Sequence, residues 1–391
     1  MNTKQLLPFY LGAIIGPIGG IGMVPLIPVL AQEWSVDFGA AALAITFYMI
    51  PFIFILIFSG SIAQVFNVRK TLSWGFILYA LGSLLCGFSP DLWFLLSSRV
   101  IQGLGAGFLT PILMAQIGEL VPEEHLGRAI GILGMAYTFG MTFGPMISGL
   151  IEVHFGWPWF FYFLAGLAII TGLFYWISSD GLAITKPQGQ GIPGVLLFLK
   201  QALFQPGVLY LGFSAFSLFI AYIGLITFTA HYLKTDLHLP TDRIGILLSS
   251  TGFSGIIISP LAGFLGDRLG RQKVFWGGTM IAFISIALMS WIPYKYSTYL
   301  ILFLGFGTGT ATAWTNLNTM AVQLSPPLRK PVTSIYNAIK YLGYALAPVL
   351  MAFLYSPFRL WGVQIGCLGA LLTSSFLAAN ARLSSSERLP N

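Results

Sequence analysis

Long apolar runs constrain the fold of this chain more than any other feature of its sequence. Of its 391 residues, 56% are hydrophobic and only 8% are charged, whereas about 25% of the residues in a soluble domain are charged. An α-helix needs about 20 apolar residues to cross a membrane. Such runs predict twelve spanning helices, at 5–30, 38–66, 71–89, 92–118, 128–152, 158–178, 206–233, 243–266, 274–293, 297–324, 332–356 and 359–381. We therefore expect an all-α membrane protein.

The longest gap between the apolar runs, residues 179–205, is rich in glycine and proline. This segment predicts a cytoplasmic linker between an N-terminal bundle, 1–178, and a C-terminal bundle, 206–391, of six helices each. An internal repeat supports the division, because Gly60 and Gly263 open similar segments 203 residues apart. The fold class is therefore expected to be two pseudo-symmetric six-helix bundles.

The positions of lysine and arginine predict the orientation in the membrane. If the N-terminus is cytoplasmic, thirteen of the 19 basic residues lie in cytoplasmic segments and four in outer segments. Cytoplasmic loops carry such an excess, so both termini are expected to be cytoplasmic. The same topology explains the net charge of +7, and no nucleic-acid partner is expected. Short loops and the lack of an N-x-[ST] acceptor favour the inner membrane of a bacterium, which is its plasma membrane.

A charged segment between the eighth and ninth apolar runs carries the most specific motif. It reads G-F-L-G-D-R-L-G-R-Q-K from Gly263, with Asp267, Arg268, Gly270 and Arg271 at its charged or glycine positions. Such charges avoid hydrocarbon, so we expect a tight hairpin loop at a membrane surface. The pattern G-x-x-x-D-R-x-G-R-x-K resembles the loop signature of the major facilitator superfamily, a family of transporters. In that family the segment follows the second helix of each six-helix half.

The resemblance implies twelve helices in two halves that rock about a central site. In the family this loop latches the two halves in the outward-open state. The N-terminal copy has lost its acid, since Gln64 stands at that position, while Arg69 keeps the basic end. Conformational switching is therefore expected to depend more on Asp267 and Arg268, or the resting state is expected to be biased.

The fourth apolar run contains an arginine, which is costly within a membrane unless it faces a cavity or a partner. It reads Arg99-Val-Ile-Gln102-Gly103, which resembles the family motif R-x-x-Q-G. The resemblance implies a role for Arg99 in proton coupling or substrate contact. The alternative is a structural arginine bonded to backbone carbonyl groups. The glycines that follow, and the related glycines of the tenth run, are expected to allow close helix packing rather than nucleotide binding.

The fifth apolar run indicates the direction of transport. Gly140, Gly144, Pro145 and Gly149 match the antiporter motif G-x-x-x-G-P-x-x-G-G except at Ser148. Small residues at this spacing make a smooth helix face, and proline removes one backbone hydrogen bond and is expected to kink the helix. In the family this motif is typical of exporters, so the resemblance implies an antiporter for efflux.

Polar residues in the C-terminal half predict a substrate site. A lysine within a membrane helix is expected to be functional, and Lys340 shares one helical stripe with Tyr336, Asn337 and Tyr344. The neighbouring candidates on the seventh and tenth runs are Tyr222, Thr312, Trp314 and Asn316.

No acid lies in the middle of an apolar run. The nearest are Glu119, at the inner end of the fourth run, and Glu152, at the outer end of the fifth. A cavity with a lysine and no carboxylate is net positive, which favours anionic, zwitterionic or neutral amphipathic cargo over cations. Two arrangements would contradict this expectation: Glu119 turned into the cavity beside Lys340, or Lys340 turned toward lipid.

A proton gradient is the expected driving force, and no cofactor or metal is expected. Burial disfavours a lone charge, so Lys340 is expected to gain and lose a proton as the site opens, with proton and anion bound together. His231 is the other group that could titrate near neutral pH. Uncoupled facilitated diffusion, including import or export of a siderophore or another organic anion, stays open.

Two other classes compete with a transporter. A membrane enzyme needs a nucleophile and base, a metal cluster or paired carboxylates at membrane depth, and no such motif occurs in the apolar runs. A sensor of transporter descent would lose the polar stripes of the cavity. We therefore expect a transporter and not an enzyme, with a small-molecule substrate and the lipid bilayer as partners, acting as a monomer.

Overall fold

The computed structural model describes residues 3–179, 197, 199–325 and 328–386. Most of the predicted linker, 179–205, lies outside the described residues. Every regular element in the described part of the chain is a helix. The all-α expectation is therefore confirmed.

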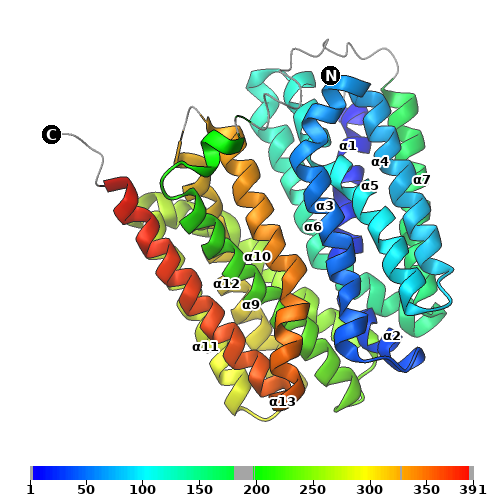
Figure 1. Cartoon of the computed structure of the whole chain (residues 1–391), viewed down its shortest axis with the longest axis vertical. Coiled ribbons are helices and arrows are strands. Elements are labelled where there is room, and N and C mark those ends of the chain that lie inside the picture. Colours follow the sequence, from blue (N-terminus) through cyan, green and yellow to red (C-terminus); the bar gives the residue numbers. More distant parts are fainter. Residues whose placement is uncertain (1–2, 180–196, 198, 326–327, 387–391) are drawn as a thin grey trace. The chain divides into compact units, whose positions relative to one another are not determined.

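The N-terminal half folds into long helices that follow the predicted runs (Figure 1). The first predicted run is divided by a short 3₁₀ segment, where Pro25 and Pro28 leave backbone oxygens without the amide donors that a continuous helix uses. The elements are α1 (Thr3–Ile21), η1 (Val24–Leu26), α2 (Ile27–Glu33), α3 (Phe38–Phe66), α4 (Val68–Gly87), α5 (Leu92–Leu120), α6 (Glu123–Phe155) and α7 (Pro158–Ser178).

The C-terminal half has the same character. Its elements are α9 (Val208–Thr235), α10 (Thr241–Leu269), α11 (Arg271–Trp291), α12 (Tyr296–Gln323) and α13 (Arg329–Ser386). The last element, α13, consists of two helices separated by a kink. At the kink, Arg359 has a non-helical backbone with φ 55° and ψ −149°, two residues after Pro357. This break separates the two predicted runs 332–356 and 359–381.

Nine helices in the described part of the chain are long and apolar enough to cross a membrane. That number counts the two halves of α13 once and leaves out the less apolar α4 and α12. Once α13 is divided at Arg359 and both of these helices are included, each of the twelve predicted spans corresponds to a helix.

The chain forms two compact units. The first unit contains Met1–Pro193 and Leu233–Ser249, and the second contains Gly194–Tyr232 and Ser250–Asn391. The end of α9 and the first turns of α10 thus belong to the first unit. The predicted domain boundaries, at 178 and 206, stay a prediction.

The signature segment is not the hairpin loop that its charges suggested. α10 continues as a helix from Gly263 to Leu269, and α11 begins at Arg271, so Gly270 alone departs from the helix, with φ 93°. Glycine adopts this left-handed backbone without steric cost. One residue is therefore enough for the turn, and the charged side chains lie on helix ends.

The same turn occurs in the N-terminal half at Asn67, 203 residues earlier, with φ 74° between α3 and α4. Asparagine tolerates a positive φ better than most residues. Its side chain also accepts a hydrogen bond of 2.9 Å from the backbone N–H of Arg69. The internal repeat therefore extends to the backbone of the turn.

Glycines pack neighbouring helices closely, as predicted. A Cβ on Gly105 of α5 would lie under 3.0 Å from the backbone nitrogen of Tyr79 on α4. In the second unit, a Cβ on Gly309 of α12 would meet Ala282 of α11 in the same way. Tyr79 and Ala282 are 203 residues apart and the two glycines are 204 apart, so the two close approaches lie within one residue of each other in the repeat.

Substitution of Gly105 should therefore destabilise the first unit. We expect Gly105→Ala to cost about 1–3 kcal/mol, because the added methyl forces the backbones of α4 and α5 apart. Gly166→Ala on α7 is the matched control, since a Cβ there meets nothing within 4 Å. Thermal unfolding in detergent, followed by tryptophan fluorescence, measures both. An unchanged midpoint for Gly105→Ala would contradict the packing account.

Candidate functional site

Lys340 lies in the first half of α13, and only 7% of its surface is exposed. Its Nζ donates a hydrogen bond of 2.7 Å to Oδ1 of Asn337. The rings of Tyr341, Tyr336 and Phe219 lie 4.6, 5.5 and 5.7 Å from the ammonium nitrogen, within the range of a cation–π interaction. The side chain is therefore buried among aromatic rings of the second unit rather than turned toward lipid.

Further aromatic side chains surround these three rings. The ring of Phe219 on α9 lies 5.8 Å from Trp314 on α12 and 6.4 Å from Tyr344 on α13. Tyr222 stacks on Phe306 of α12, 5.8 Å away. We call this set of side chains the aromatic cage: Phe219, Tyr222, Trp314, Tyr336, Tyr341 and Tyr344.

Sequence reasoning missed one member of the aromatic cage and left another unassigned. Tyr341 was missed because consecutive residues point in different directions on an ideal helix. Phe219 belongs to an aromatic stripe on α9, formed by Phe213, Phe216, Phe219 and Tyr222, which the sequence alone favours as packing or lipid contact. Phe213 of the same stripe is 44% exposed, whereas Phe219 is 6% exposed. Burial distinguishes them, and no sequence signal does.

The surroundings of Lys340 lack a countercharge among the residues that the structure describes. The ion pair recorded among the described residues joins Arg271 to Asp267, at the signature segment and not at Lys340. The buried hydroxyl oxygen of Tyr336 also has no hydrogen-bond partner in the described part of the chain. Within the described residues, the aromatic cage therefore contains a buried cation without a carboxylate partner and a buried hydroxyl group without a hydrogen-bond partner. The side chain of Glu119 lies outside the described residues.

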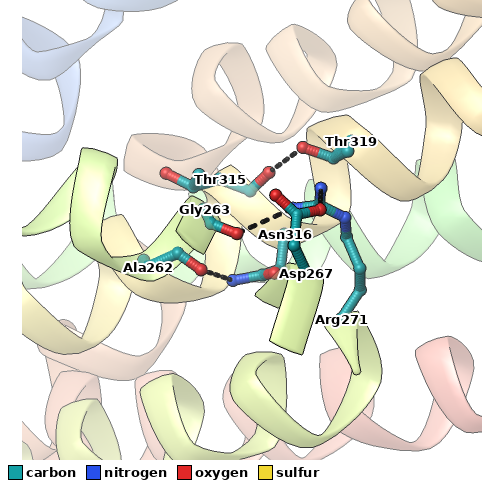
Figure 2. Close-up of polar contacts among 7 residues, drawn as sticks. All are labelled: Ala262, Gly263, Asp267, Arg271, Thr315, Asn316 and Thr319. Carbon is teal, nitrogen blue, oxygen red and sulfur yellow. Dashed lines mark hydrogen bonds and ion pairs between the residues drawn. The ribbon is translucent and has the colours of Figure 1, made fainter. Parts of the chain in front are cut away.

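The polar residues of α12 do not form one stripe beside Lys340. The side-chain amide of Asn316 donates a hydrogen bond of 2.9 Å to the carbonyl oxygen of Thr312. It donates another, of 3.4 Å, to the carbonyl oxygen of Ala262 on α10 (Figure 2). The hydroxyl of Thr312 donates to the carbonyl of Thr308 on its own helix. Asn316 therefore contacts the part of α10 at the start of the signature segment. Of the three α12 candidates, only Trp314 joins the aromatic cage.

The signature segment is held together across its turn. Arg271 reaches back over Gly270 to the carboxylate of Asp267 and to the carbonyl oxygen of Gly263, 3.4 Å away (Figure 2). The guanidinium of Arg268 lies 4.3 Å from the ring of Phe264. Asp267 is thus paired locally, between the last turn of α10 and the first turn of α11.

Two glycines of the signature have different roles from those expected. A Cβ on Gly263 would meet nothing within 4 Å, so no helix approaches closely there. The close approach is at Gly266, where a Cβ would collide with the Asn316 side chain. Gly270 and Arg271 line a cavity of about 530 Å³. Lys273, an exposed residue in the first turn of α11, also lines this cavity.

In the N-terminal copy, the side chain of Gln64 lies outside the described residues. Arg69 donates a hydrogen bond of 2.6 Å to the carbonyl oxygen of Trp176 on α7. Its guanidinium also lies 4.1 Å from the Trp176 ring. This arginine therefore joins the start of α4 to the end of α7.

Arg99 is fully buried in the first unit and is hydrogen-bonded to three neighbours. Its Nε donates to the carbonyl oxygen of Ala44 at 3.1 Å, and its Nη1 donates to that of Gly19 at 3.0 Å. Nη1 also donates to Oε1 of Gln102 at 2.5 Å, and Gln102 donates to Ser83 at 2.8 Å. The network joins α1, α3, α4 and α5.

Two further features place Arg99 among aromatic and polar groups. Its guanidinium lies 4.2 Å from the ring of Tyr48. Its Nη2 is buried and has no hydrogen-bond partner among the described residues. The backbone carbonyl partners match the structural alternative, while the free Nη2 leaves one donor for a further contact.

The small residues of α6 pack against two segments of the first unit. A Cβ on Gly140 would lie 2.6 Å from the carbonyl oxygen of Ile14 on α1, and Gly144 packs on the same helix. A Cβ on Gly149 would lie 2.5 Å from the carbonyl oxygen of Thr241, at the start of α10. The α6 helix continues through Pro145 from Glu123 to Phe155.

One hydrogen bond adds to the contact between α6 and α10. The backbone N–H of Met146 donates a hydrogen bond of 3.1 Å to the hydroxyl oxygen of Ser249. His231, the other titratable candidate, packs its ring 5.2 Å from that of Tyr355 in the second unit.

Comparison with known proteins gives relatives of one kind. The chain is 25% identical to a riboflavin transporter of Clostridioides difficile, over 82% of this chain and 80% of the relative. It is 23% identical to a multidrug resistance protein B homolog of Mycobacterium tuberculosis, over 85% and 73%. Its fold matches a bacterial homolog of the human lysosomal transporter Spinster with a TM-score of 0.76 at 17% identity, over 97% and 96% of the two chains.

A family model covers most of the sequence. The model of the Major Facilitator Superfamily matches residues 9–348 and 211–387. The predicted helices, the repeat and the signature residues agree with this match. The chain therefore belongs to the Major Facilitator Superfamily.

Proposed function

We propose that this secondary transporter is a proton-coupled exporter of small amphipathic organic molecules, anionic or neutral, that works by alternating access. The observation that carries the proposal is Lys340, an ammonium group buried in the aromatic cage without a carboxylate partner among the described residues.

The charge of Lys340 supports selection against cations. An unpaired charge in a buried site is costly, and a ligand of opposite charge reduces that cost. A cationic ligand would add like-charge repulsion instead. The neutral amide oxygen of Asn337 and the aromatic rings compensate the ammonium group only in part. An anion in the aromatic cage would therefore be bound more tightly than a cation of the same shape.

The aromatic cage is suited to a cargo molecule with a flat apolar body. Aromatic side chains stack on planar ligands, and few polar groups are needed to fix their orientation. The free hydroxyl of Tyr336 supplies one such polar group. Relatives named for riboflavin and for multidrug resistance fit a site of this kind.

A single lysine gives two modes of proton coupling. Burial disfavours a lone ammonium, so an anionic cargo binds together with the proton of Lys340, and both cross in the same direction. A neutral cargo displaces that proton instead, so that proton and cargo cross in opposite directions. The charge of the cargo therefore decides whether coupling is cotransport or exchange. An inward proton gradient drives export only by exchange, so export of an anion together with its proton depends on the anion's own concentration gradient.

The direction and orientation rest on other residues. The small face of α6, with Gly140, Gly144 and Gly149, supports export because this motif is typical of exporters in the family. We further infer from the distribution of lysine and arginine that both termini are cytoplasmic, in the inner membrane of a bacterium.

We also assign Arg99 a positioning role. Its donors hold carbonyl groups of α1 and α3 and the side chain of Gln102 in place. A guanidinium that binds carbonyl oxygens on separate helices fixes their spacing, because its donors are rigidly arranged. The first unit can then move as one body during alternating access.

Replacement of Lys340 should abolish transport of anions. We expect Lys340→Ala to lower uptake of an aromatic sulfonate into proteoliposomes about 10–100-fold, since a hydrogen bond to a charged group contributes roughly 1.5–3 kcal/mol. Lys295→Ala removes an exposed lysine and is the matched control. The assay is repeated with pH gradients of either sign and with an aromatic quaternary ammonium probe. Equal transport of the cation, with Lys340→Ala resembling wild type, would contradict the proposal and make Glu119 the next residue to test.

Replacement of Arg99 should reduce stability as well as transport. Arg99→Ala leaves two buried carbonyl oxygens without donors, at about 1–3 kcal/mol each, so we expect a clear fall in the thermal midpoint in detergent. Arg128→Ala is the control, because Arg128 is exposed. Loss of transport with an unchanged midpoint would instead assign Arg99 to cargo or proton binding.

A further inference from the structure

Each unit has an apolar groove at the same position of the internal repeat. The groove of the first unit lies between α4 and α7 and has a volume of about 370 Å³. The groove of the second unit lies between α11 and the second half of α13 and measures about 360 Å³. All seven residues that line the second groove, such as Trp276 and Ser375, correspond to lining residues of the first 203 positions earlier, such as Ser73 and Gly172.

The grooves open onto the outer surface of their helices. In the first groove, Ile77 is 53% exposed, Ile169 is 45% exposed and Leu173 is 59% exposed. Because the chain spans a membrane, exposed apolar side chains at this depth face the bilayer rather than water. In the second groove Met280 and Leu372 are each 60% exposed. An apolar chain from the bilayer can therefore enter each groove from the side.

A lysine lies one helical turn beyond the lining residues at one end of each groove, and Lys273 also lines the cavity of about 530 Å³. Lys70 precedes the lining residue Ser73 by three positions on α4, and Lys273 precedes Trp276 by three positions on α11. Residues three apart share one face of a helix. Both lysines are exposed. Each groove thus combines an apolar body with one positive end.

The charged end of each groove is braced in the same way. Arg69 donates a hydrogen bond of 2.6 Å to the carbonyl oxygen of Trp176 on α7. At the equivalent position of the repeat, Gln272 donates a hydrogen bond of 3.2 Å to the carbonyl oxygen of Ala378 on α13. These bonds tie together the two helices that form each groove. The end beside the lysine is therefore held at a fixed width.

We propose that each groove binds an acyl chain of an anionic glycerophospholipid from the bilayer, with its phosphate at Lys70 in the first unit and at Lys273 in the second. An apolar cleft with a single positive end is complementary to an amphiphile with a single anionic headgroup. Its recurrence at repeat-related positions shows that the arrangement belongs to the six-helix unit rather than to one chance gap.

The two sites differ in charge. The first groove has Arg69 beside Lys70. The second has the neutral Gln272 beside Lys273, and its nearby Arg271 is neutralised by the ion pair with Asp267. A second cation near the headgroup strengthens attraction to an anionic lipid. The groove between α4 and α7 therefore binds the anionic lipid more tightly and fills first.

Native mass spectrometry of the full chain tests the proposal by counting retained lipids. The probes are dioleoylphosphatidylglycerol and dioleoylphosphatidylcholine, which differ in headgroup charge. We expect saturable retention of the anionic lipid, with about five-fold weaker binding at the first site in Lys70→Gln. The double variant Lys70→Gln/Lys273→Gln should lose the preference for the anionic lipid. Lys200→Gln, which removes an exposed lysine that belongs to none of the helices forming the grooves, should behave as wild type.

A second pair of variants tests the groove itself. Ile169→Trp fills the first groove, whereas Ile170→Trp adds the same side chain at a neighbouring position that is 67% exposed and outside the lining. We expect the first to lose one retained anionic lipid and the second to lose none. Equal retention in the two variants, or an unchanged preference in the double lysine variant, would overturn the proposal.

Tryptophan quenching in wild-type protein gives a measurement that depends on no destabilising variant. Trp176 and Trp276 line the two grooves and are 47% and 45% exposed. Phosphatidylglycerol brominated on its acyl chains should quench these two residues more than brominated phosphatidylcholine does. The difference should shrink in Trp176→Phe and Trp276→Phe. Equal quenching by the two lipids would contradict a headgroup-selective site.

Discussion

The low polarity of the membrane interior is the constraint on which this structure depends. Each backbone N–H and C=O in hydrocarbon must find a partner within the protein, which is why every regular element of the described chain is a helix. The same constraint separates the two buried cations. Arg99 is hydrogen-bonded to backbone carbonyl groups, which supports its proposed positioning role. Lys340 has one amide oxygen and aromatic rings as neighbours, which supports its proposed role in binding the cargo.

The helices could be predicted from the sequence because length and apolarity alone decide what crosses a membrane. Close packing at Gly105 and Gly309 was also predictable, since small residues permit close approach. The end of α10 was not. Charges such as Asp267 suggested a loop, yet charged side chains at a helix end reach the surface without breaking the helix. Only the positive φ of Gly270 breaks it.

The site was predictable where chemistry is rare and unpredictable where it is common. A lysine within an apolar run can be recognised from the sequence as a functional candidate, because burial of a charge is costly. Aromatic residues are frequent, so no sequence pattern separates Phe219 in the aromatic cage from the exposed Phe213. Asn316 shares α12 with Trp314, but two positions rotate a side chain to a different face, and it contacts α10 instead.

The central claim is that the cargo and the proton meet at Lys340. Isothermal titration of an aromatic sulfonate into wild type and Lys340→Gln, in two buffers that differ in ionisation enthalpy, counts the protons that accompany binding. Over a range from mildly acidic to alkaline pH, wild type should take up protons with the sulfonate wherever Lys340 begins neutral, and the variant should take up none. The same proton count in both proteins, or no proton uptake by wild type at any pH, would contradict the claim.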